Sequence, residues 1–155
     1  MSFKKRVLIG ITTGVIALSA LGFSASAYGS DNNIGYSYSV PGGQNWGFSD
    51  AQYRGASDTS VPWKVNFTYS SEGTGTCMQY FLAGTEWFSP SKLSDYKLVK
   101  QGSGAKYYRA YDSACKRDVR LGARNNNNVS NSYTVSGYWD EETEKHTFSD
   151  WTKNL

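Results

Sequence analysis

Histidine, the side chain most often used for proton transfer in enzymes, occurs once in the chain, at His146. Glu144 lies two residues before it, so in an extended segment the two side chains would share one face and could form a pair. A hydrolase would also need a nucleophile, and no serine lies in a G-x-S-x-G setting. A single histidine also excludes a zinc site built from several histidines. The sequence therefore predicts an exposed histidine and a protein that is not an enzyme, with no metal and no cofactor.

Carboxylates are densest in residues 140–144, where four of the five side chains are acidic. Such a cluster could bind calcium, but its spacing is not that of an EF-hand loop, and we favour a solvated turn. A glycosidase would need two carboxyl groups about 5–10 Å apart. The sequence brings no acidic pair together, so a glycan-active enzyme ranks third among the functions that we consider. The pairs weighed are Glu72 with Glu86 and Asp112 with Asp118.

Cys77 and Cys115 are the two cysteines of the chain. Two cysteines allow one intramolecular disulfide, and such bonds are typical of exported proteins. Closing a loop of about 39 residues would stabilise the fold by roughly 4 kcal/mol in the chain-entropy model. We therefore predict a disulfide between Cys77 and Cys115, the alternative being two free thiols that never meet.

The N-terminus has the three parts of an export signal. Residues 4–6 are basic, residues 7–21 are mainly apolar, and residues 25–27 (Ala-Ser-Ala) are the small residues that signal peptidase requires. An apolar stretch of about 15 residues is shorter than the ~20 that span a bilayer, which argues against a membrane anchor. We expect a signal peptide over residues 1–27, cleaved between Ala27 and Tyr28, and a mature protein that is secreted or associated with the cell wall.

Cleavage would change the charge of the protein. The predicted leader holds three of the 16 basic residues and none of the 13 acidic ones, so 13 of each remain. A mature chain without excess positive charge is not expected to bind nucleic acid. Residues 28–155 contain no further stretch that could span a membrane, and their length suits a single domain.

Aromatic residues are the most useful clue to function. The chain has five Trp, twelve Tyr and seven Phe, and Trp46, Trp87 and Trp151 lie in segments rich in glycine or serine. We expect some of these rings to be exposed, where they could stack on sugar rings or contact another protein. The alternative is ordinary partial burial.

Four residues form the predicted binding surface: Tyr107, Tyr108, Arg109 and Tyr111. Neighbouring residues of a strand face opposite sides, so Tyr107, Arg109 and Tyr111 would share one face and Tyr108 would take the other. If one face packs in the core, at least one tyrosine must stand outside. Arg109 would add a donor for a polar ligand.

The elements that position these residues are predicted to be strands, because apolar residues alternate with polar ones and no segment has a sustained helical period. Two strands, at 63–69 and 76–83, flank a glycine-containing turn at 71–75 and predict a β-hairpin. About eight short strands predict an all-β protein, an antiparallel β-sandwich, with a barrel as the alternative. The other predicted strands are 34–40, 46–54, 96–100, 105–111, 118–124, 132–139 and 143–148.

Five segments carry a resemblance that extends over nearly the whole mature chain: NIGY at 33–36, PWKVN at 62–66, SEGTGT at 71–76, GSGAKYY at 102–108 and VSGYWDEET at 135–143. The chain resembles a family of small secreted proteins of Gram-positive bacteria classed as a domain of unknown function. This resemblance implies export and a β-rich fold, and it names no activity and no catalytic residue. In composition and architecture the chain is also similar to the lactococcin-type bacteriocins, which are markedly shorter.

Three functions follow from these observations, in order. The first is a non-catalytic extracellular module that binds cell-envelope glycan or an extracellular protein. The alternative is a bacteriocin-like antibacterial protein, and the third is a glycan-active enzyme.

Overall fold

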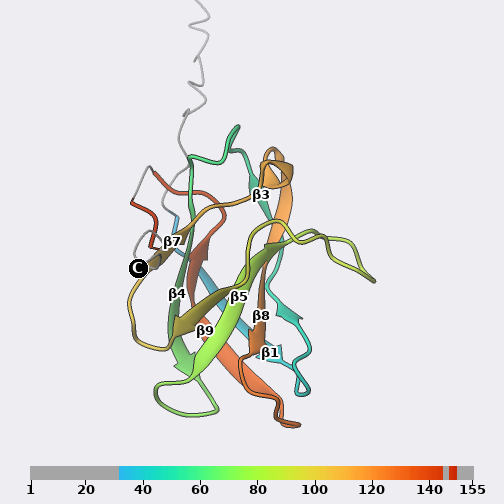
Figure 1. Ribbon diagram of the computed structural model, residues 1–155, viewed down its shortest axis with the longest axis vertical. Helices are drawn as coiled ribbons and strands as arrows, with labels where there is room; N and C mark the ends of the chain where they lie inside the picture. Colours follow the sequence, from blue (N-terminus) through green and yellow to red (C-terminus); the bar gives the residue numbers. More distant parts are fainter. Residues whose placement is uncertain (1–31, 145–146, 150–155) are drawn as a thin grey trace, which may run out of the picture.

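The computed structural model describes residues 32–144 and 147–149. Within these residues, nine β-strands form two sheets that pack face to face (Figure 1), and one short 3-10 helix lies outside the sheets. All strand pairs are antiparallel, so the predicted all-β antiparallel sandwich is confirmed. The predicted leader, with its cleavage site between Ala27 and Tyr28, lies outside the described residues, as does His146.

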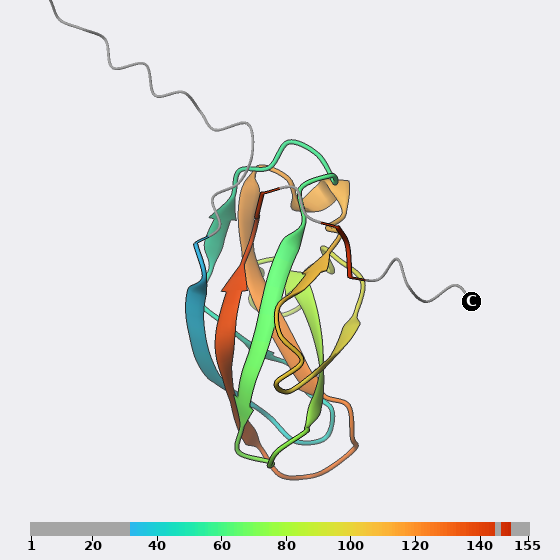
Figure 2. The same ribbon diagram turned by 90° about the vertical axis from the view of Figure 1, so that its left-hand side faces the viewer.

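The first sheet has the order β1-β9-β4-β7, and Figure 2 shows β1, β9 and β4 side by side. The second sheet has the order β2-β8-β5-β6, with β3 pairing with β8 beyond β2. A 3-10 helix over Asp112–Ala114 leads into β8. The bounds of the strands are β1 Ile34–Val40, β2 Gly47–Phe48, β3 Gln52–Arg54, β4 Trp63–Ser70, β5 Cys77–Ala83, β6 Lys97–Lys100, β7 Lys106–Tyr108, β8 Arg117–Asn125 and β9 Tyr133–Asp140.

The core lies between the sheets and is built from alternate residues of the strands. In β5, Met78, Tyr80 and Leu82 point into it and are fully buried. The Tyr36 hydroxyl donates a hydrogen bond of 3.0 Å to the Tyr80 hydroxyl, which links the two sheets. The alternation seen in the sequence therefore reflects a real inner face, with the other face of each sheet directed outward.

The loop between β4 and β5 joins two different sheets, so the predicted hairpin is wrong. β4 pairs with β7 and β9, whereas β5 pairs with β6 and β8. The predicted turn is present locally, since Gly73 and Gly75 have φ angles of 129° and 82°. The two strands bury their apolar faces against each other across the core, and a turn sequence alone does not determine this choice.

A bulge in β4 changes the face on which its last residues lie. The register with β9 shifts between Phe67 and Tyr69. An inserted residue reverses the alternation. Phe67 is therefore buried, Tyr69 is exposed and Ser70 is buried.

The predicted disulfide is also wrong, because Cys77 and Cys115 are free and each is half-buried. Cys77 is the first residue of β5, and its neighbour Met78 pairs with Asn125, the last residue of β8. Cys115 lies just before Arg117, the first residue of β8. The nine residues of β8 span roughly 25 Å. A disulfide needs Cα atoms within about 7 Å, so the fold keeps these thiols too far apart.

Three other predicted strands differ from the structure. Residues 46–54 form two short strands, β2 and β3, that pair with different parts of β8. The strand predicted at 105–111 ends at Tyr108, after which Ala110 forms an isolated bridge with Ser94. The described residues of 143–148 form no strand. β9 already pairs with β1 on one side and β4 on the other, so residues 143–148 have no free edge of β9 to pair with.

Candidate functional site

The predicted tyrosine surface is divided between the core and the exterior. Tyr108 is buried, with its ring centroid 5.2 Å from that of Trp63, so it belongs to the core rather than to a contact surface. Tyr107 is half-buried. Its backbone amide donates a hydrogen bond of 2.9 Å to the Ser149 hydroxyl, and its carbonyl oxygen accepts one of 2.8 Å from the Ser149 amide.

The other two residues of the predicted surface contact different partners. Arg109 is exposed, with its guanidinium 4.5 Å from the centroid of Phe148 and 3.3 Å from the hydroxyl of Thr59. Tyr111 is half-buried and donates a hydrogen bond of 2.5 Å to an Asp95 carboxylate oxygen. A role in binding for Tyr107, Arg109 and Tyr111 stays a prediction.

Aromatic side chains gather instead on the outer face of the second sheet. Phe48 and Phe81 both pair with Gly122, one from each side of β8, and therefore lie in one row across the sheet. Trp46 and Tyr96 flank this row, with their ring centroids 5.0 Å apart and their planes inclined by 21°. We call these four residues the aromatic face: Trp46, Phe48, Phe81 and Tyr96.

Phe81 holds the aromatic face together. Its ring centroid lies 4.5 Å from Trp46, 5.0 Å from Tyr96 and 6.3 Å from Phe48. Beneath it, a Cβ added to Gly122 would come within 2.2 Å of a Phe81 ring carbon, so the ring fills the space that the glycine leaves. Phe81 is only 3% exposed although it points away from the core. The surrounding rings thus form a small apolar cluster outside the sandwich.

Cationic side chains lie over these rings. The Arg124 guanidinium is 4.5 Å from the Trp46 centroid and 5.4 Å from that of Tyr96. Arg120 lies 5.4 Å from Phe48, and Lys92 lies 4.6 Å from Tyr96. Cations above aromatic rings are attracted to the negative faces of the rings. The cations therefore cover part of the ring faces, and the surface that stays open combines aromatic carbon atoms with hydrogen-bond donors.

Part of this surface is open to solvent. Tyr96 is 43% exposed, and Leu98 beside it in β6 is exposed as well. Gln79 lies opposite Leu98 in the sheet and accepts a hydrogen bond of 2.7 Å from Arg124 Nε. A ligand on this face would meet an aromatic ring, an aliphatic side chain and two polar groups in fixed positions.

The segment that follows β5 projects from the body of the sandwich (Figure 1). It carries Trp87 and Phe88, whose side chains are 85% and 96% exposed. Glu86 organises it: its carboxylate accepts hydrogen bonds of 3.0 Å from the Ser91 amide and 2.8 Å from Arg117. These bonds, chiefly those from backbone amides, lower the pKa of Glu86 to about 2. The two aromatic side chains are thus held out from an ordered base.

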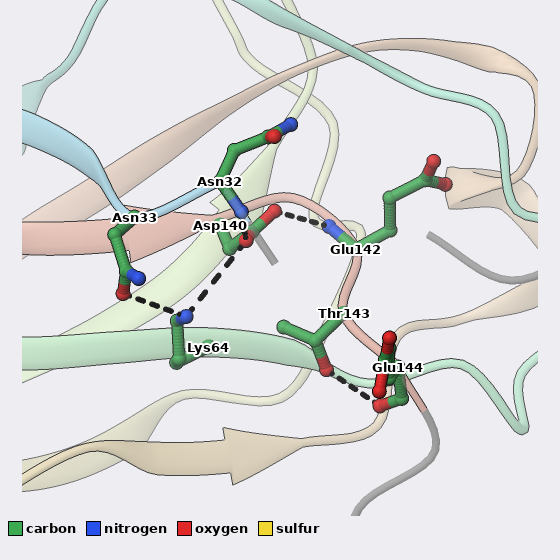
Figure 3. Close-up of polar contacts among 7 residues, drawn as sticks. All are labelled: Asn32, Asn33, Lys64, Asp140, Glu142, Thr143 and Glu144. Atoms are coloured by element: carbon green, nitrogen blue, oxygen red, sulfur yellow. Dashed lines mark hydrogen bonds and ion pairs between the residues drawn. The ribbon is translucent and has the colours of Figure 1, made fainter. Parts of the chain in front are cut away.

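The acidic segment at the end of β9 is used in an internal network, which Figure 3 shows. The buried Lys64 and Asp140 lie 3.8 Å apart. Asp140 also accepts a hydrogen bond of 2.5 Å from the Asn32 amide, and Lys64 donates one of 2.8 Å to the Asn33 side chain. Burial raises the pKa of Asp140 and lowers that of Lys64. This network ties the start of β1 to β4 and β9.

The neighbouring carboxylates do not converge on one point. Glu141 is buried with one carboxylate oxygen unpaired within the described structure, and burial raises its pKa to about 7. Glu142 instead accepts a hydrogen bond from the Ala56 amide. Among the described residues, no three His, Cys, Asp or Glu side chains are grouped to hold a metal ion. The segment is therefore neither a solvated turn nor a cluster of shared ligands.

One of the two acidic pairs weighed for glycosidase chemistry is separated by the fold. Glu72 accepts a hydrogen bond from Asn125, at one end of β8, and Glu86 binds Arg117 at the other end. The nine residues between these ends span roughly 25 Å, which is too far for a catalytic dyad.

The sequence pointed to Trp46 and Trp87 as aromatic residues in polar surroundings, and it missed Phe48, Phe81 and Tyr96. One signal was available. Tyr80, Phe81 and Leu82 form an unbroken apolar run, which in a strand places apolar side chains on both faces. Such a run indicates that the outer face of that strand is also covered.

Comparison with protein families assigns the chain to one family. Residues 23–143 match the family DUF2712, described as a protein of unknown function, and the chain belongs to this family. No curated protein and no solved structure matches it. In the described part of the chain, no helix has the length and hydropathy needed to cross a membrane.

Proposed function

We propose that this protein is an exported, non-catalytic module of a Gram-positive bacterium that binds a glycan of the cell envelope. The aromatic face is the observation that carries the proposal. The three-part leader over residues 1–27 and the resemblance to small secreted proteins support export and a ligand outside the cell.

The chemistry of the aromatic face suits a sugar chain. The C–H faces of a pyranose ring are apolar and flat and can pack on an aromatic ring, while the hydroxyl groups around the ring need hydrogen-bond partners. Tyr96 and Leu98 supply exposed apolar surface, and Arg124 and Gln79 supply a donor and an acceptor beside it. A face of this kind binds a repeating polymer without any nucleophile or metal.

Binding to purified cell walls tests the proposal. The purified protein should sediment with cell walls that have been treated with protease, and digestion of the glycan strands should release it. Sedimentation that protease abolishes would instead indicate a protein partner, and this result would contradict the glycan proposal.

Export is tested separately by the N-terminus of the secreted product. Mass spectrometry of culture supernatant should find a chain that starts at Tyr28. An intact chain starting at Met1 and held in the membrane fraction would contradict export.

A second candidate function, a bacteriocin-like antibacterial protein, is favoured by the exposed Trp87 and Phe88. Aromatic side chains of this kind partition into the interface of a lipid bilayer. In this case the purified protein should inhibit the growth of other cells, and replacing both residues by Ser should remove the inhibition. If the protein inhibits the growth of no strain in a panel of related bacteria, the antibacterial function is contradicted and the binding module remains.

A further inference from the structure

A cavity of about 160 Å³ lies where one edge of each sheet meets the other. β1 is an edge strand of the first sheet, and β2 and β3 lie at an edge of the second. Aromatic and polar side chains line the cavity together, and they include Tyr36, Tyr38, Phe48, Trp139, Asp50 and Gln52. The cavity is therefore not a defect in an apolar core but a space with chemically mixed walls.

The backbone explains why the sandwich is open here and closed next to it. A Cβ added to Gly47 would come within 2.3 Å of the Ser39 carbonyl oxygen, so β1 and β2 touch at that point. Further along, Asp50 and Gln52 stand opposite the residues of β1 that precede Ser39, and the cavity lies between them.

One polar group of the wall is buried without a partner. Within the described residues, the buried Tyr38 hydroxyl has no hydrogen-bond partner. The exposed Asp50 and the half-buried Gln52 line the same cavity, with side chains that solvent can reach. Ser49 differs, since its hydroxyl already donates a hydrogen bond of 2.8 Å to the Asp50 carbonyl and accepts one of 3.0 Å from the Leu121 amide. A buried polar group without a partner is costly, and a ligand with hydroxyl groups would relieve that cost.

We propose that this cavity is a subsite for a single pyranose unit, at the end of a glycan chain or on a branch of it. The inference rests on the proposed glycan binding and adds to it a place and a ligand size. A cavity of about 150 Å³ holds one benzene-sized ring. A pyranose with its hydroxyl groups is larger, so this partly open cavity would hold one side of the sugar, and the rest would extend out of the opening. The half-buried rings of Tyr38 and Phe48 would pack on the sugar, and Asp50, Gln52 and the Tyr38 hydroxyl would bind its hydroxyl groups.

The cavity and the aromatic face share one residue, Phe48. This residue belongs to the wall of the cavity, and its ring also packs on Phe81, with centroids 6.3 Å apart. A glycan chain lying on the aromatic face could thus place one sugar unit in the cavity.

Titration calorimetry with free sugars tests the inference, using the purified protein with glucose, galactose and N-acetylglucosamine as probes. At least one sugar should bind with a stoichiometry of one. The variants Asp50→Ala and Gln52→Ala should each weaken it by about tenfold, as expected for a lost hydrogen bond. Asp118→Ala, which removes an exposed carboxylate from β8, is the matched control and should bind as the unmodified protein does.

The outcomes separate this inference from the proposed function. Cell-wall binding that persists while no free sugar binds, or sugar binding that Asp50→Ala and Gln52→Ala leave unchanged, would overturn the subsite alone. Failure of the unmodified protein to bind cell walls would overturn both the subsite and the proposed function. The thermal midpoint of each variant shows that it is folded.

Discussion

Gly122 is the residue on which the aromatic face depends. It sits in the middle of β8 with Phe48 on one side and Phe81 on the other, and the Phe81 ring occupies the space above it. Any side chain at this position would lift the ring away from the sheet. The glycine is therefore explained by close approach and not by backbone conformation.

Replacing this glycine tests that explanation. Gly122→Ala should lower the free energy of unfolding by about 1–3 kcal/mol, because the new Cβ overlaps the Phe81 ring. Gly35→Ala is the matched control, since nothing lies within 4 Å of its added Cβ. Denaturant unfolding of both variants measures the difference, and equal stability of the two would contradict the close packing.

Glu141 makes stability depend on pH. Burial, with Asp140 and Glu142 nearby, raises its pKa to about 7 although Arg54 opposes the shift. A carboxyl group whose pKa is raised by folding stabilises the fold when protonated. Its contribution is complete below the ordinary pKa, near 4.5, and is lost as the pH rises through about 7.

The variant Glu141→Gln keeps the shape of the protonated form at every pH. The unmodified protein should lose up to about 3 kcal/mol of stability between roughly pH 4.5 and pH 8, and the variant should lose much less. Thermal midpoints across this range provide the measurement. Parallel pH profiles for the two proteins would show that Glu141 is not the group responsible.

At the scale of the element, alternation in the sequence located most strands but not their partners. The predicted strand at 34–40 coincides with β1, because its period of two arises from its own residues. The partners of β4 and β5 depend on which faces meet across the core, and no local sequence encodes that. The same reason explains why the sequence could not predict that Trp46 and Tyr96 would meet over Phe81.

The bulge in β4 gives a prediction about two aromatic residues of the same strand. The sequence period places Phe67 and Tyr69 on one face, but the register shift turns Tyr69 outward. Phe67→Ala should cost about 3–5 kcal/mol, as expected for a large core residue. Tyr69→Ala should cost within about 0.5 kcal/mol. Comparable losses in denaturant unfolding would mean that the bulge is absent.

At the scale of the whole molecule, the sandwich separates stability from recognition. The space between the sheets holds the core, which includes Trp63, Phe67 and Trp139. The outer face of the second sheet holds a separate group of rings with cations above them. Composition alone predicted the excess of aromatic residues but could not assign it to either place.

The cysteines are understood at this scale as well. An even number of cysteines and the predicted export favoured a bond between Cys77 and Cys115. In the structure the two thiols lie near opposite ends of β8, too far apart to bond. Counting cysteines reports whether a bond can form, whereas the topology decides whether the thiols can meet.

The central claim is that the outer face of the second sheet binds glycan, and two tyrosines of similar exposure test it most directly. Tyr96 is 43% exposed on the aromatic face, and Tyr138, on β9 of the other sheet, is 50% exposed. The measurement is the dissociation constant for protease-treated cell walls of the variants Tyr96→Ala and Tyr138→Ala, with thermal midpoints as a control for folding. Removing one stacking ring should weaken binding by about tenfold in Tyr96→Ala, while Tyr138→Ala binds as the unmodified protein does. Equal affinity of the two folded variants would contradict the claim.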